Sequence, residues 1–278
     1  MLTIIIPTYN CENYIDEVLA SVLDQLPEED ECIVVDDGST DGTVQKLKAR
    51  EGLQENLRIY YEDHAGASMA RNYGLELAKG EYVTFLDCDD CLQEGFLEQS
   101  RPLLDEDADL YIFGIRQEPL NGSHDFWTVA DHTYHSVSEF ADEYIRTRKL
   151  LIYSNCNKFY RKSIIDELVL RFEENTTYGE DRLFNYKYLT GCAKIRDHSP
   201  AVVTSSLIML RYIQRSEQTK TADPRYLEQI TRLHDEKMYC FLALSEGTTA
   251  EERQAFMDYD LSKEINIARE KMGEDPKE

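Results

Sequence analysis

Carboxylates gather at several points of this sequence, and the sharpest pair is Asp87 and Asp89, which stand at positions i and i+2 directly after the apolar run 82–86. Two carboxylates with this spacing can turn toward one ion. Their hard oxygens suit Mg²⁺ or Mn²⁺, which would bridge to a diphosphate and offset the charge on a departing nucleoside diphosphate. Taken in isolation, the same aspartates would be read as an acidic turn that caps a helix.

A second acidic cluster follows the apolar run 32–35. Asp36 or Asp37, at the end of a strand, could accept a hydrogen bond from a uracil N–H or a ribose hydroxyl. The alternative is a helix-capping turn with Ser39 or Asp41 as the cap. The two interpretations are compatible, because one aspartate can bind a ligand while the others cap.

Two further motifs place polar side chains at expected helix starts. Arg71 lies in the first turn of a helix over 67–78, where free N–H groups favour anions and a guanidinium adds a phosphate fork; Gly80 is expected to stop that helix. The alternative is a surface arginine. Glu180 and Asp181 open another helix and could supply a general base, although acids at a helix start also favour the dipole.

Lys158 is a weaker candidate, in the segment 155–160. Its ammonium could meet a phosphate or an acid. The alternative is a surface lysine whose stem lies along apolar side chains.

The elements that must position these residues alternate between strand and helix. Short apolar runs at 2–6, 32–35, 57–61, 82–86 and 110–113 predict strands, and the apolar spacing predicts helices at 14–26, 44–47 and 67–78. Such alternation predicts an α/β fold with a mostly parallel sheet and helices on both faces. Ligands bind at the carboxyl ends of such strands, where the polar clusters fall.

The pattern changes after about residue 114. Residues 119–123 predict a hairpin tip, 201–212 predict one or two strands, and the chain becomes helical and charged from about 224. On this helical segment Tyr226, Leu227, Ile230 and Leu233 would share one face. Dimerisation through that face and docking on the same chain both remain open.

The composition excludes some classes of protein. The formal net charge is -24, from 30 basic and 54 acidic residues. This balance argues against sequence-independent binding of nucleic acid and against whole-surface attraction to anionic lipid. Seven irregularly spaced cysteines suggest reduced thiols and a cytoplasmic protein, and neither a signal peptide nor a transmembrane stretch is apparent. Peripheral contact with the inner face of the plasma membrane stays open.

Taken together, these motifs resemble the family 2 glycosyltransferases, which have the GT-A fold. The resemblance is carried by residues 4–10, 34–42, 65–72, 80–90 and 179–181. It implies 1–114 as the half that binds the nucleotide-sugar and 115–222 as the acceptor-binding half of the same domain, and the residue pattern adds 223–278 as a helical C-terminal extension. The last region matches no family pattern.

The resemblance also implies roles for residues. Tyr9 and Asp37 would hold the base, and Pro7 and Thr8 would shape its pocket. The remaining roles fall on residues already singled out: Arg71 would approach the diphosphate, Asp87 would touch ribose or metal, Asp89 would bind Mn²⁺ or Mg²⁺, and Asp181 would be the base, with Glu180 and Lys158 as support for the acceptor side.

The implied reaction is an inverting transfer from a UDP-sugar to a hydroxyl of a saccharide or lipid-linked saccharide, in the synthesis of cell-surface polysaccharide. Two alternatives stay open. One is a nucleotide-binding or scaffold protein without catalysis, against which the intact acids argue. The other is a sugar nucleotidyltransferase, which usually has a glycine-rich, basic loop after its first strand, where this chain has residues 7–10, Pro-Thr-Tyr-Asn.

Overall fold

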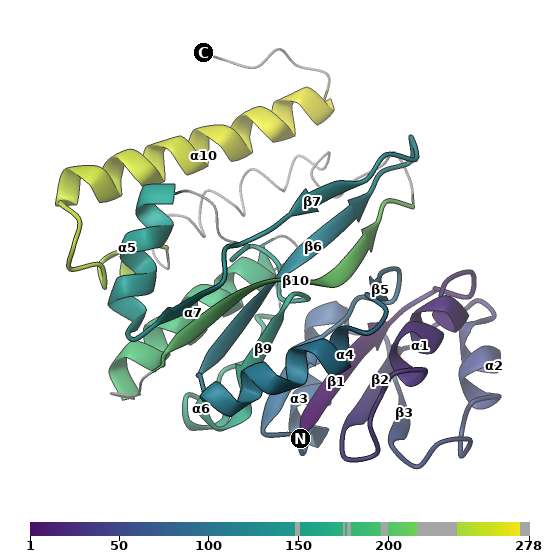
Figure 1. The fold of residues 1–278 in the computed structure, drawn as a ribbon. Coiled ribbons are helices and arrows are strands. Elements are labelled where there is room, and N and C mark those ends of the chain that lie inside the picture. The colour runs from purple at the N-terminus through teal and green to yellow at the C-terminus, as the bar shows by residue number, and fades with distance from the viewer. Residues whose placement is uncertain (148–150, 175, 177–178, 196–199, 216–237, 273–278) are drawn as a thin grey trace.

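One sheet with helices on both faces forms the body of the protein (Figure 1). The computed structural model describes residues 1–147, 151–174, 176, 179–195, 200–215 and 238–272. Within these residues the strands follow the order β3-β2-β1-β4-β9-β6-β10-β5, while β7 pairs with β6 and β8 pairs with β10.

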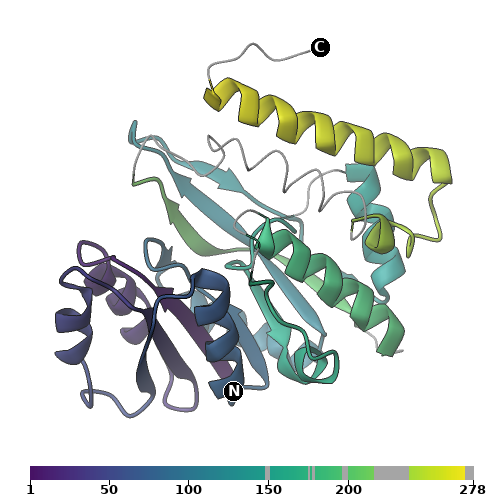
Figure 2. The ribbon, with the colours of Figure 1, turned by 180° about the vertical axis from the view of Figure 1, so that it is seen from behind.

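The N-terminal part supplies four parallel strands and the helices between them. Its elements are β1 (Leu2–Thr8), α1 (Ile15–Leu23), β2 (Glu31–Asp37), α2 (Thr43–Lys48), β3 (Leu57–Glu62), α3 (Ala67–Leu77) and β4 (Tyr82–Phe85). Every residue of β1, β2 and β4 is buried, because α1 and α2 cover one face of the sheet and α3 the other (Figures 1 and 2). These strands therefore read as continuous apolar runs.

The second part completes the sheet with mixed strand directions. Its elements are β5 (Cys91–Leu92), α4 (Phe96–Ser100), the 3₁₀ helix η1 (Arg101–Glu106), β6 (Leu110–Glu118), β7 (Asp125–Trp127), β8 (His132–Tyr134), α5 (Val137–Thr147), β9 (Lys158–Arg161), α6 (Lys162–Glu167), α7 (Glu180–Ile195) and β10 (Val202–Ile213). The long strands β6 and β10 pair in parallel, whereas β9 runs antiparallel between β4 and β6. Nothing in the sequence pattern indicated this reversal.

Among the residues described after β10, two helices follow: α9 (Tyr239–Leu242) and α10 (Ala250–Met272). In both ribbon views α10, drawn in yellow, lies across the end of α5, on the far side of the molecule from β2 and β3 (Figures 1 and 2). Both helices agree with a helical C-terminal extension. The predicted helical face with Tyr226 to Leu233 lies outside the described residues.

The predicted strands and helices of the first 114 residues are confirmed, with ends that differ by a few residues. The hairpin tip is confirmed by a turn in which Gly122 N–H donates to Pro119 O, and 201–212 is one strand. The prediction for Gly80 was wrong, because α3 already ends at Leu77. A Cβ at Gly80 would lie 2.6 Å from the backbone nitrogen of Thr3, so glycine is needed there for close approach to β1.

Candidate active site

The turns that follow β1 and β2 are tied to each other. Asn10 N–H donates to Ser39 Oγ at 2.9 Å, and the Asn10 side-chain oxygen accepts from Thr40 N–H at 2.8 Å. Of the two predicted caps, Asp41 accepts from Thr43 N–H at the start of α2, whereas Ser39 serves the neighbouring turn. The two strand ends therefore form one rigid edge.

Asp37 and Tyr9 lie on this edge beside His64. The Asp37 carboxylate accepts from Ala65 N–H at 2.7 Å and from Gly66 N–H at 2.9 Å, and it lies 2.8 Å from His64 Nδ1. Tyr9 is 42% exposed, and its ring stacks on the His64 ring with 4.2 Å between the centroids. Asp37 thus shapes the loop before α3, and Tyr9 offers an aromatic face at the edge. Pro7 and Thr8 are buried in β1 beneath them.

Arg71 is the centre of the candidate site. It is buried, and Gly74, one turn further along α3, lets this helix pack against Ile5 of β1. Arg71 Nη2 contacts Asp87 Oδ1 at 2.7 Å. Its Nη1 lies 3.5 Å from Glu180 Oε1 and 3.6 Å from Asp181 Oδ1.

The alternative of a surface arginine is therefore wrong. Burial lowers the pKa of Arg71, but the charges of Asp87, Asp181 and Glu180 more than offset this and raise it well above its ordinary value. Arg71 is hence a permanent cation. It joins residues that stand about a hundred positions apart in the sequence, because β4 and α7 converge on α3.

The acids after β4 face different surroundings. Asp87 is partly exposed and Asp89 is exposed, while the Asp90 carboxylate is buried and accepts from Ile213 N–H at 2.9 Å. Burial, and after it the charges of Asp87 and Asp89, raise the pKa of Asp90 well above its ordinary value. Asp87 and Asp89 are thus the accessible pair, and Asp90 fixes the loop to β10.

Arg215 is a functional candidate that sequence reasoning missed. It follows β10, and its Nε donates to the backbone oxygen of Asp89 at 3.1 Å. Its guanidinium also lies 3.2 Å from Glu17 and over the Tyr14 ring at 4.5 Å. A lone arginine after a strand gives no signal in one sequence, because only the fold brings it to the acids after β4.

Lys158 occupies a position that neither sequence interpretation foresaw. It is fully buried, so it is not a surface lysine and cannot itself touch an acceptor or a phosphate. Its ammonium donates to the backbone oxygens of Leu151 and Ser154 and to Asn157 Oδ1 at 2.8 Å. Asn185 Nδ2 of α7 also donates to Ser154 O, at 3.2 Å. The segment 151–157, here called the β9 loop, is therefore held from two sides.

This burial predicts an unusual dependence of stability on pH. Burial lowers the pKa of Lys158 to about 7, although Asp181 and Cys156 act in the opposite direction. Between about pH 7 and pH 10 the Lys158 side chain therefore holds a proton in the unfolded chain that it lacks in the folded chain, and its contribution to the free energy of unfolding rises with pH. Lys158→Met lacks this rise, so the stability difference should widen by about 2 kcal/mol between about pH 6.5 and pH 9. Urea unfolding of both proteins measures it. The control is Lys162→Met, which removes a lysine paired with the exposed Asp166; a constant difference for Lys158→Met would contradict the prediction.

A family comparison decides what kind of protein carries this arrangement. Residues 3–169 match the model of the family described as glycosyl transferase family 2. The chain belongs to this family. The resemblance in the sequence motifs is thereby confirmed.

Named relatives of this family-2 chain include glycosyltransferases of two bacteria. TuaG of Bacillus subtilis, named for teichuronic acid biosynthesis, is 40% identical over 114 residues, which are 41% of this chain and 45% of TuaG. The poly(ribitol-phosphate) beta-N-acetylglucosaminyltransferase TarS of Staphylococcus aureus is 33% identical over 190 residues, 66% of this chain and 32% of TarS. The matches thus span less than half of these relatives.

A solved structure confirms the fold. The crystal structure of S. aureus TarS 1–349 in complex with UDP-GlcNAc aligns with a TM-score of 0.70 at 22% identity, over 97% of this chain and 72% of that chain. The α/β GT-A fold predicted from the motifs is therefore confirmed.

A divalent metal can be tested against the acids of this family-2 site. Among the described residues no three His, Cys, Asp or Glu side chains form a group that could hold a metal ion. Asp87 and Asp89 nevertheless offer oxygen ligands at an accessible edge. Because Mg²⁺ is usually held by one or two carboxylates together with substrate phosphates and water, these two residues fit such an ion.

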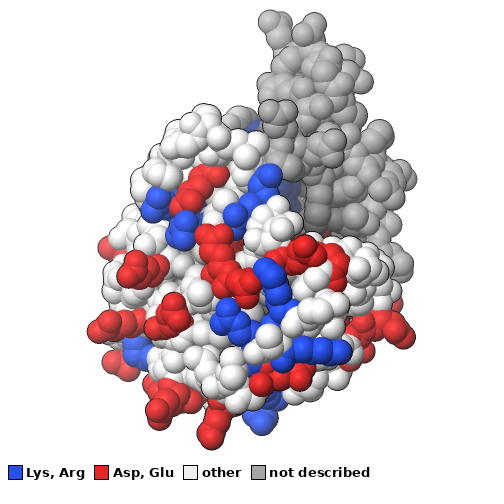
Figure 3. All heavy atoms as spheres, turned by 90° about the vertical axis from the view of Figure 1, so that its right-hand side faces the viewer, with Lys and Arg blue, Asp and Glu red and all other residues white. Residues whose placement is uncertain are grey.

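The surface beside the site carries charges of both signs. Figure 3 shows acidic and basic side chains interspersed over the face on the side of α1 and α2. This face therefore carries charges of both signs rather than acidic side chains alone. No helix of the described part of the chain is both long and apolar enough to cross a membrane.

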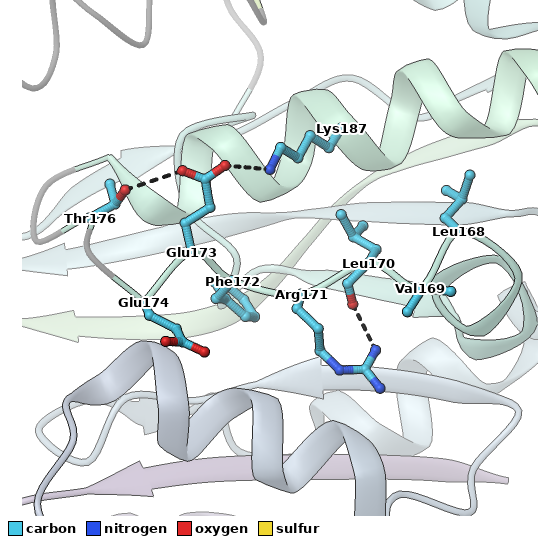
Figure 4. A pocket seen from close by; sticks show the side chains of 9 residues that line it. All are labelled: Leu168, Val169, Leu170, Arg171, Phe172, Glu173, Glu174, Thr176 and Lys187. Carbon is cyan, nitrogen blue, oxygen red and sulfur yellow. Dashed lines mark hydrogen bonds and ion pairs between the residues drawn. The ribbon is translucent and has the colours of Figure 1, made fainter.

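A separate cavity of about 520 Å³ lies along the segment that follows α6, beside Lys187 of α7 (Figure 4). It is lined by Leu168, Val169, Leu170, Arg171, Phe172, Glu173, Glu174, Thr176 and Lys187. Glu173 contacts Lys187 at 2.6 Å and Thr176 at 3.5 Å. Phe172 connects this segment to the site, because Arg71 lies over its ring at 5.4 Å. The described acids of the candidate site do not line the cavity, which is therefore distinct from the site.

Proposed function

We propose that this family-2 chain is an inverting glycosyltransferase that moves a sugar from a UDP-sugar to a hydroxyl of a saccharide or lipid-linked saccharide. The observation that carries the proposal is the contact of one buried guanidinium, Arg71, with Asp87, Glu180 and Asp181. This contact supports the proposal because Asp87, which we propose for the metal and the diphosphate, and Asp181, which we propose for proton transfer, both lie within reach of the same side chain.

In the proposed reaction the acceptor hydroxyl oxygen attacks the anomeric carbon while the bond from that carbon to the diphosphate oxygen breaks, so that UDP leaves. Asp181 takes the hydroxyl proton as general base. Asp87 and Asp89 would hold Mn²⁺ or Mg²⁺, and such an ion would supply positive charge that stabilises a departing diphosphate. Tyr9 and Asp37 hold the uracil in a pocket shaped by Pro7 and Thr8, and Arg71 and Arg215 add cationic charge near the phosphates.

Residues 1–114 bind the donor in this proposal, residues 115–222 bind the acceptor, and 223–278 form a helical extension. UDP-GlcNAc is the first donor to test, since TarS was crystallised with it. The names of TuaG and TarS support an acceptor in cell-surface polysaccharide synthesis. The chemistry would then take place in the cytoplasm, at or near the inner face of the plasma membrane. A homodimer stays a proposal that gel filtration would test.

Calorimetric titration of UDP with and without Mn²⁺ tests the donor site. We expect Mn²⁺ to strengthen binding in the wild type, and Asp89→Ala to weaken metal-dependent binding by about 10-fold or more, because one of two carboxylate ligands is lost. Asp105→Ala is the control, since Asp105 is an exposed acid of η1. Equal binding by Asp89→Ala and the wild type would remove Asp89 from the metal site, and no binding of UDP at all would contradict the proposed donor.

A further inference from the structure

The C-terminal helix α10 reaches the candidate site through one buried carboxylate. Phe256 of α10 packs on Tyr144 of α5 with ring centroids 4.9 Å apart. Asp260 stands four residues later, on the same face of the helix, and is 3% exposed. A charged residue is thus turned into the interface between α10 and the rest of the protein.

Asp260 contacts two segments at once. Tyr153 Oη donates to Asp260 Oδ1 at 2.5 Å, and Asp260 Oδ2 lies 3.8 Å from Arg182 Nη1. The Arg182 guanidinium lies 4.1 Å from the centre of the Tyr153 ring. Burial raises the pKa of Tyr153, so its hydroxyl stays protonated and remains a donor to the carboxylate.

Both partners of Asp260 lie next to groups of the candidate site. Arg182 follows Asp181 directly, in the first turn of α7. Tyr153 belongs to the β9 loop, whose backbone oxygens are held by Lys158 and Asn185. Asp260 therefore joins the two segments beside the proposed general base, although it stands 79 positions after Asp181 in the sequence.

Stability alone does not explain this cluster. Burying an ion pair costs desolvation free energy that the attraction often fails to recover, and apolar side chains of similar volume usually serve stability as well or better. Apolar packing was available here, as the neighbouring contact of Phe256 with Tyr144 demonstrates. A buried aspartate at this place is better explained by the orientation that it imposes on its partners.

We propose that Asp260 is a positioning residue: by holding Arg182 and Tyr153 it fixes the first turn of α7, so that Asp181 faces the acceptor hydroxyl. The inference rests on the proposed function, since it assigns Asp181 the proton transfer. It also gives α10 a role, which is to hold the N-terminal turn of α7 in place.

The test compares Asp260→Leu with the wild type in steady-state transfer and in UDP binding. We expect kcat to fall about 10-fold, because misplacing a reacting group by less than 1 Å has effects of this order, while the Kd for UDP stays unchanged. Asp258→Leu is the matched control, because Asp258 is on the exposed face of α10 and bonds only Gln254 among the described contacts. Tyr153→Phe, which removes one hydroxyl, should lower kcat less, and it keeps the test usable if Asp260→Leu does not fold.

A double-mutant cycle separates positioning from general loosening of the fold. If Asp260 acts through Asp181, Asp260→Leu should lower kcat in the wild-type background and cause no further loss in Asp181→Asn. Equal fractional losses in both backgrounds, or an unchanged kcat in Asp260→Leu and Tyr153→Phe, would overturn the inference while leaving the proposed function intact. A wild-type protein that binds UDP but transfers no sugar would overturn both.

Discussion

Asp181→Asn is expected to lower the rate of sugar transfer by about 10²–10⁴-fold, the usual contribution of a positioned general base. The asparagine has nearly the same shape as the aspartate, so it fills the same space beside Arg71. It cannot take a proton from the attacking hydroxyl. The rate is measured as release of UDP from a UDP-sugar in the presence of an acceptor found by screening.

Donor binding separates this effect from damage to the site. Since Asp181 has no proposed contact with the nucleotide, the Kd for UDP should change by no more than about 2-fold in Asp181→Asn. Glu180→Gln is the matched comparison, because Glu180 neighbours Asp181 and contacts the same guanidinium. A larger loss of transfer in Glu180→Gln than in Asp181→Asn would assign the role of general base to Glu180. Full activity of both variants would exclude both residues as the general base.

The first half of the fold could be predicted from the sequence because its signals are local. Each of the strands β1 to β4 is a short apolar run, and each is followed by turn residues or by an amphipathic helix. Parallel strands place their carboxyl ends at one edge, so the polar residues after them could be assigned to one site. The prediction for Gly80 failed because glycine is typical both of a helix end and of a close approach between backbones. The sequence alone does not tell these two causes apart, and at Gly80 the cause is the close approach to Thr3.

The contacts between segments could not be predicted, because they depend on burial that no local pattern encodes. In the sequence nothing distinguishes Lys158 from an exposed lysine. In the fold it lies in β9 and is buried, and its ammonium donates hydrogen bonds to backbone oxygens of the β9 loop. Asp260 belongs to a charged helix, and the sequence does not indicate which of the acids in that helix is buried. Asp260 is buried because α10 packs against the rest of the protein. The sequence motif predicts that Arg71 approaches a phosphate, whereas its pairing with Glu180 and Asp181 could not be predicted without the position of α7.

The pairing of Arg71 with the acids of α7 predicts that Arg71→Met lowers both the free energy of unfolding and the affinity for the donor. Removing one partner of a buried ion pair leaves the others uncompensated and typically costs about 3–5 kcal/mol of free energy of unfolding. Here the variant would leave Asp87, Glu180 and Asp181 close together without their shared cation. Urea unfolding measures the loss. Arg50→Met is the control and should cost about 1 kcal/mol or less, because its partner Asp16 is about half exposed.

Arg71→Lys tests whether the fork, rather than the charge alone, aligns the two halves of the site. A lysine keeps the positive charge and should recover much of the stability, but a single ammonium cannot reproduce the planar contacts to Asp87 on one side and to the acids of α7 on the other. Asp181 would then lose its fixed distance from the donor, and the transfer rate should fall about 10²-fold with a smaller change in the Kd for UDP. If Arg71→Lys transferred sugar at the wild-type rate, apolar packing alone would have to hold β4 and α7 in their relative positions. Arg71 would then serve only to neutralise the acids around it.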